Sequence, residues 1–183
     1  MKVLVLALAI GAIVSFASEA AIAQQKKVDI TIQQKAPGVE LSLLLDKRKY
    51  KRSDELRLQV KLVNPNSRPV YVFRTLDWGP SASLTLHVHD ASGKEIEPEF
   101  WADAQTYESP DDKSAFVKLG PDHFLGANFP DSIKSLNLTR PGKYSIFVEY
   151  TSPFSIAEVD LKPYFGKEAG PLKSNVVWIE VVR

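Results

Sequence analysis

Apolar and polar residues alternate one by one along several segments of this 183-residue chain. Alternation with a period of two is typical of a β-strand with one buried and one exposed face, because successive side chains point to opposite sides. No long segment has the 3.6-residue period of an amphipathic helix, although residues 155–164 are compatible with a helical turn. We expect strands at residues 28–33, 41–45, 55–64, 69–76, 83–90, 114–119, 143–150 and 175–182.

Clusters of glycine, proline, asparagine and aspartate separate the expected strands. Such clusters are turn signals, and short strands joined by frequent turns are typical of an antiparallel β-sandwich. We therefore predict an all-β fold of about seven to nine strands. The stretch 95–112 is the exception, and we expect a long irregular insertion there. The turn clusters lie at residues 64–67, 79–80, 90–93, 120–121 and 141–142.

The beginning of the chain has the pattern of a secretory signal peptide. Lys2 precedes an apolar run at residues 3–16, and residues 21–23 form a small-x-small cleavage site. The apolar run is short for a membrane span of about 20 residues, so we expect no stable membrane anchor after cleavage. The predicted product is exported and is periplasmic or extracellular.

The cleavage prediction also sets the expected domain organisation. Residues 1–23 form the signal peptide, residues 24–37 form a loose N-terminal strand or extension, and residues 38–183 form one domain. A chain of about 160 residues after cleavage is typical of a single domain, and it buries enough surface to fold without a covalent staple.

The composition excludes several kinds of chemistry. The chain has no cysteine, so a thiolate nucleophile, a thiolate metal site and redox chemistry are excluded. Its net charge of +1 gives no reason to expect nucleic acid as a partner. The sequence contains no G-x-S-x-G, H-E-x-x-H, phosphate-loop or dinucleotide-binding motif. We therefore expect a protein that is not an enzyme and that needs no cofactor.

Four motifs resemble those of bacterial secreted immunoglobulin-like modules. They are YKRSDELRLQVKLVNPNSRPVYV (50–72), HDASGKEI (89–96), RPGKYSIFVEY (140–150) and LKSNVVWIEVV (172–182). The layout is also loosely similar to intracellular proteinase inhibitor and macroglobulin-type domains. The resemblance implies an immunoglobulin-like antiparallel β-sandwich with a binding role. It implies peptidase inhibition only as an analogy of fold, because no inhibitory loop matches residue by residue.

Two of the chain's three histidines, His87 and His89, lie two residues apart in an expected strand. They therefore point to the same face, as two ligands of a zinc or copper ion would. Such an ion needs further ligands, and only folding would bring His123 near the pair. In the alternative interpretation both histidines belong to the polar, exposed row of the strand. We favour this second interpretation and expect no bound metal, with a metal-binding protein as an alternative function.

The insertion at residues 95–112 carries many acidic residues and the aromatic side chains of Phe100, Trp101 and Tyr107. Long loops on a rigid sandwich are frequent recognition sites, and aromatic rings give contact area at low entropic cost. An equally good interpretation packs Phe100 and Trp101 onto the end of the sandwich, while the acidic residues keep the loop soluble. Together with Trp78, they are our candidate binding residues. Their acidic rim would favour a basic partner, which we expect to be a protein or a cell-envelope component.

Five of the six residues at 47–52 are basic. A cluster of this kind can bind a polyanion such as heparin or the phosphates of lipopolysaccharide. One short basic segment in a nearly neutral protein is weak evidence for such binding, and we interpret the segment as a solvated hairpin turn.

Phe147 and Trp178 occupy outward positions of the last two expected strands. If these strands pair, the two rings form an apolar patch, which marks an interface when it is exposed. We expect instead that the first strand, a bend of the sheet or the connection at residues 152–175 covers both rings. The sequence thus predicts an exported, non-catalytic binding domain that makes its contacts through loops.

Overall fold

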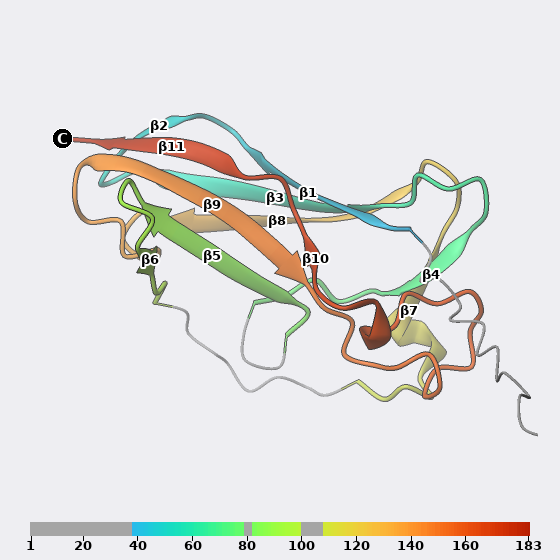
Figure 1. The fold of residues 1–183 in the computed structure, drawn as a ribbon. Coiled ribbons are helices and arrows are strands. Elements are labelled where there is room, and N and C mark those ends of the chain that lie inside the picture. The colour runs from blue at the N-terminus through green and yellow to red at the C-terminus, as the bar shows by residue number, and fades with distance from the viewer. Residues whose placement is uncertain (1–37, 79–81, 100–107) are drawn as a thin grey trace, which may run out of the picture. The chain divides into compact units, whose positions relative to one another are not determined.

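The computed structural model describes residues 38–78, 82–99 and 108–183 (Figure 1). These residues lie within one compact unit, residues 35–183. They form eleven strands and two short 3-10 helices, and the described ranges contain no α-helix. Accordingly, none of the helices in these ranges is long and apolar enough to cross a bilayer. The all-β prediction is confirmed, whereas the predicted signal peptide and the strand at 28–33 lie outside the described residues.

Eight of the strands have four or more residues, close to the predicted number, and three are shorter. The longer strands are β1 (Glu40–Leu45), β3 (Glu55–Val63), β4 (Val70–Phe73), β5 (Leu84–Asp90), β7 (Phe116–Leu119), β8 (Phe124–Ser132), β9 (Gly142–Tyr150) and β11 (Val177–Val182). The shorter elements are β2 (Lys49–Lys51), β6 (Glu95–Ile96), β10 (Leu172–Lys173) and the 3-10 helices η1 (Lys113–Ala115) and η2 (Lys167–Ala169).

Two sheets form the layers of a β-sandwich (Figure 1). The three-stranded sheet has the order β1-β3-β8, and the six-stranded sheet has the order β2-β11-β9-β5-β6 with β10 paired to β9. The paired strands are antiparallel except β2 and β11, which run parallel. Strands β4 and β7 form a third, two-stranded sheet at one end. The predicted antiparallel β-sandwich is confirmed.

The buried row of each strand fills the space between the two sheets. In β3, Leu56, Leu58, Val60 and Leu62 are at most 1% exposed, whereas the residues between them are exposed or half-buried. This is the face that the alternation predicts, and burying each such side chain contributes about 1.5–3 kcal/mol to folding. Partners of these residues in the core include Leu41, Leu43, Leu86, Val88, Ile146, Val148, Ile179 and Val181.

Strand β8 is the largest element that the sequence does not predict. Its sequence, FLGANFPDS, contains glycine and proline, which are unfavourable in the interior of a sheet. It nevertheless pairs with β3 along all nine residues, from Phe124 opposite Val63 to Ser132 opposite Glu55. Among the described strands β3 is its only partner, so Pro130 lies on an edge strand, where a missing N–H group is tolerated.

The basic segment at residues 47–52 lies in the hairpin connection between β1 and β3, as the sequence predicts, but residues 49–51 of this connection form a short strand. Its central residues form β2, and Tyr50 is completely buried. The Tyr50 hydroxyl lies 2.7 Å from Asp46 Oδ1, and burial raises the pKa of this phenol. A buried tyrosine in the middle of the basic run therefore holds β2 against the sandwich and leaves the cations on the outside.

Residues 155–164 contain a turn but no helix. The Ser155 N–H donates to Glu158 Oε2 at 2.7 Å, and the Glu158 N–H donates to Ser155 Oγ at 3.2 Å. This reciprocal pair is the start signal of a helix, but Pro163 disfavours helical backbone at the residue before it. The segment instead places Val159 and Tyr164 in a second buried cluster with Phe73, Ala115 and Phe116.

Candidate functional site

The outer face of the six-stranded sheet carries the most exposed aromatic residue of this sheet. In one row across the strands of this face, Trp178 of β11 lies opposite Ser145 of β9, and Ser145 lies opposite His89 of β5. Trp178 is 57% exposed, and Val176, two residues before it, is 47% exposed. These are two of the four large hydrophobic residues that are exposed in the described ranges.

A row of charged residues lies next to the tryptophan. Glu180 of β11 lies opposite Lys49 of β2 on one side and opposite Lys143 of β9 on the other. Lys49 Nζ lies 3.0 Å from Glu180 Oε2, and the Glu180 N–H donates to the Arg48 carbonyl at 2.8 Å. Neither Arg48 nor Lys143 forms an ion pair within the described ranges, so the row has a net positive charge.

These residues enclose a shallow trough of about 440 Å³ against the indole. We define the Trp178 surface as Trp178 and Val176 together with the cations Arg48, Lys49 and Lys143. The indole supplies a flat apolar face, and the three cations supply hydrogen-bond donors at its edge. The arrangement suits contact with a ligand that has an apolar face and acidic groups.

Phe147, the other outward aromatic residue, is covered on both sides. Lys173 Nζ lies 3.7 Å from the centre of the Phe147 ring. His87 is stacked on the same ring at a centroid distance of 4.5 Å, and His89 is nearly parallel to it at 5.7 Å. Lys173 belongs to the connection at 152–175, so the predicted cover is present for Phe147, whereas Trp178 remains exposed.

The two histidines lie on one face, as the strand geometry predicts, and their partners are now defined. His87 Nδ1 lies 2.9 Å from Glu95 Oε1, and its Nε2 lies 3.5 Å from Glu149 Oε2. The hydrogen bond with His87 lowers the pKa of the Glu95 carboxyl. Within the described ranges no group of three or more histidine, aspartate and glutamate side chains is arranged to hold a metal ion.

The remaining candidates from the sequence lie elsewhere or outside the described residues. Trp78 is half-buried, and its ring centroid lies 4.5 Å from that of Phe129 on β8. Phe100, Trp101 and Tyr107 fall outside the described ranges, so their role in binding stays a prediction.

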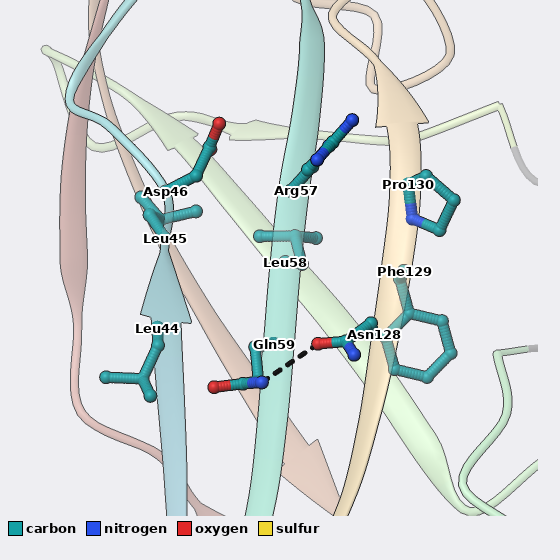
Figure 2. A pocket seen from close by; sticks show the side chains of 9 residues that line it. All are labelled: Leu44, Leu45, Asp46, Arg57, Leu58, Gln59, Asn128, Phe129 and Pro130. Atoms are coloured by element: carbon teal, nitrogen blue, oxygen red, sulfur yellow. Dashed lines mark hydrogen bonds between the residues drawn. The ribbon is translucent and has the colours of Figure 1, made fainter.

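A second hollow lies on the outer face of the three-stranded sheet (Figure 2). Its volume is about 590 Å³, and Leu44, 44% exposed, lies on its β1 side. Gln59 and Asn128 are joined across its floor by a hydrogen bond of 2.9 Å, which Figure 2 shows as a dashed line. Asp46 and Arg57 line it with opposite charges, so the hollow favours no particular sign of charge in a ligand.

No protein-family model and no curated protein matches the chain. Solved structures similar to it include the CARDB domain of a Pyrococcus furiosus protein in complex with di-metal ions. The identity is 15%, the TM-score is 0.38, and the match covers 81% of this chain and 96% of that domain. A β-glucosidase from Erythrobacter marinus is 14% identical with a TM-score of 0.38, over 79% of this chain and 15% of the enzyme. Likeness at this level gives no argument about function.

Proposed function

We propose that this protein is an exported, non-catalytic binding domain that holds a protein or cell-envelope component against its Trp178 surface. The observation that supports this proposal is the exposure of Trp178 in the middle of a regular sheet face. Scattered exposed apolar residues are normal, but here Val176, two residues before Trp178, is also exposed, and three cations line the trough next to the indole. Tryptophan and arginine are the residues that most often dominate the energy of a binding interface.

The proposal moves the contact surface from the loops to a sheet face. The sequence favours Trp78 and the loop at 100–107, but Trp78 is packed against Phe129. Binding through the aromatic residues at 100, 101 and 107 stays a prediction from the sequence. Export remains part of the proposal because the first 23 residues have the pattern of a signal peptide.

Affinity capture from envelope and culture extracts tests this proposal, with Trp178→Ala as the main variant. The matched control is Phe124→Ala, because Phe124 is also 57% exposed but lies on the three-stranded sheet. We expect a component that the parent and the Phe124→Ala variant retain and that the Trp178→Ala variant loses. Loss in a Trp101→Ala/Tyr107→Ala variant alone would return the contact surface to the loop.

Cell fractionation tests the export. A shorter, processed form in the periplasmic or extracellular fraction is the expected result. Accumulation of the unprocessed chain in the cytoplasm would contradict the proposal, whichever surface binds.

A further inference from the structure

Cations lie on two sides of the exposed indole. Arg48, Lys49 and Lys143 line the trough on one side of Trp178. On the other side, the ammonium of Lys173 lies over the ring of Phe147. Phe147 comes two residues after Ser145, the residue of β9 that lies opposite Trp178. Residues two apart in a strand are separated by about 7 Å, so the row of Lys49 and Lys143 and the position of Phe147 each lie one such step along the strands from the row of Trp178.

The shape of the surface favours an extended ligand. The trough is an open hollow on a sheet face, and small molecules instead prefer enclosed clefts that bury most of their surface. A chain that runs along the strands would meet the row of cations, then the indole, and then a further cation. Each unit of such a ligand would need a flat apolar face, and acidic groups would have to flank it.

An acidic polysaccharide has this chemistry. The C–H groups on one face of a pyranose ring pack against an aromatic ring, as apolar groups do against tryptophan. Carboxylate and sulfate groups accept charge-assisted hydrogen bonds from lysine and from the planar guanidinium of arginine. The ring would occupy Trp178, and the acidic groups would pair with Lys143 or Arg48 on one side and with Lys173 on the other.

An anionic membrane fits the same face less well. The carboxylates of Glu180 and Glu149 lie on it among the cations, at positions opposite Lys143 and Lys173. A uniformly negative plane would meet these carboxylates together with the cations. A narrow chain can pass beside them, and Glu180 is already paired with Lys49 at 3.0 Å.

We infer that the Trp178 surface, extended by Lys173, binds a linear acidic polysaccharide whose sugar rings carry carboxylate or sulfate groups. This inference rests on the proposed function and specifies its ligand.

The test uses the protein purified from the exported fraction and titrated with polygalacturonate and heparin oligosaccharides, followed by calorimetry. Neutral dextran oligosaccharides are the ligand control. We expect Trp178→Ala to weaken binding about tenfold or more, as loss of a central aromatic contact does. Lys143→Gln should weaken it about threefold, and added salt should weaken it further, because exposed ion pairs are screened.

The matched controls are Phe124→Ala and Lys61→Ala on the opposite sheet, where Lys61 Nζ lies 5.0 Å from the centre of the Phe124 ring. Both should keep the parental affinity for each acidic oligosaccharide within about twofold. Equal weakening in these controls and in Trp178→Ala would contradict the assignment of the site.

Three further outcomes would overturn the inference. Equal binding of dextran would remove the role of charge. Binding to vesicles of anionic phospholipid, with no binding of either acidic oligosaccharide, would assign the face to a membrane. Absence of binding to any of these probes would also overturn it. The proposed function would survive that last result if affinity capture still depended on Trp178, and both would fail if capture did not.

Discussion

The side chain of Asn175 makes both backbone hydrogen bonds of Leu43. Its Oδ1 accepts from the Leu43 N–H at 2.9 Å, and its Nδ2 donates to the Leu43 carbonyl at 3.0 Å. Leu43 belongs to β1 of the three-stranded sheet, and Asn175 precedes β11 of the six-stranded sheet. The amide therefore joins the edges of the two layers where no strand pair connects them within the described ranges.

Replacing Asn175 with alanine should lower the free energy of unfolding by about 1–3 kcal/mol, because it leaves two backbone groups of Leu43 without partners. Urea denaturation at neutral pH measures this change. Asn128→Ala is the control, since its hydrogen bond to Gln59 lies on the surface and should contribute no more than about 0.5 kcal/mol. Equal losses in the two variants would contradict the bridging role of Asn175.

Asn64 should be more sensitive still, because it is completely buried where β3 leaves its sheet. Its Nδ2 lies 2.9 Å from the Arg68 carbonyl and 3.0 Å from the Leu119 carbonyl, and its Oδ1 accepts from the Asn66 N–H at 3.0 Å. We expect Asn64→Ala to cost roughly 2–4 kcal/mol of unfolding free energy, because several buried polar groups lose their partners together. A loss as small as that of Asn128→Ala would show that water replaces the amide.

The two outward aromatic residues should differ in their effect on stability. Phe147→Ala should destabilise the fold by about 1–3 kcal/mol, because the ring loses its contacts with Lys173 and His87. Trp178→Ala should change the free energy of unfolding by no more than about 0.5 kcal/mol, as is usual for exposed positions. Thermal and urea unfolding of both variants checks this. A strongly destabilised Trp178→Ala variant would mean that the indole has a structural role.

Acid should weaken the turn at Ser155. Hydrogen bonds from the Ser155 hydroxyl and N–H, together with the Lys167 ammonium, lower the pKa of Glu158 from an ordinary 4.5 to about 2. A carboxyl whose pKa is lower in the folded state stabilises the protein above its unfolded pKa. That contribution is lost as the pH falls from about 4.5 to about 2.

Urea midpoints measured between neutral pH and about pH 2 test this linkage. The parent should lose more stability than Glu158→Gln over that interval. Glu40→Gln, at an exposed position of β1, should follow the parent curve. Parallel curves for the parent and Glu158→Gln would contradict the assignment.

Zinc should leave the imidazole signals of His87 and His89 unchanged in a titration followed by nuclear magnetic resonance. The physical reason is that both rings lie against Phe147 and that His87 Nδ1 is engaged by Glu95. Metal-dependent shifts that disappear in His87→Ala/His89→Ala would restore the metal-binding alternative. His123→Ala serves as the control, because His123 Nδ1 lies 2.8 Å from the Pro121 carbonyl in a separate turn.

The sequence predicts most of the strands because their alternation reports which face is buried. It fails for β8, where burial is shallow and glycine and proline hide the pattern, and for β2, where one buried tyrosine is surrounded by lysines. Both are recognised only through their partners β3 and β11, which are distant in the chain.

The candidate site shows the same limit of sequence reasoning. The outward position of Trp178 can be read from the sequence, but the cations beside it come from β2 and β9. Only the register of the sheet brings Lys49 and Lys143 into one row with Glu180. The predicted cover by the connection at 152–175 is correct for Phe147 because Lys173 reaches that ring.

The position of β11 also decides when this protein can fold. It lies inside the six-stranded sheet, between β2 and β9, although it comes after all the other described strands in the chain. The ribosome must therefore add residue 182 before this sheet and the core beneath it can close. Until then β2 and β9 lack the strand that lies between them, so the closure of this sheet depends on contacts between distant parts of the chain, which form slowly.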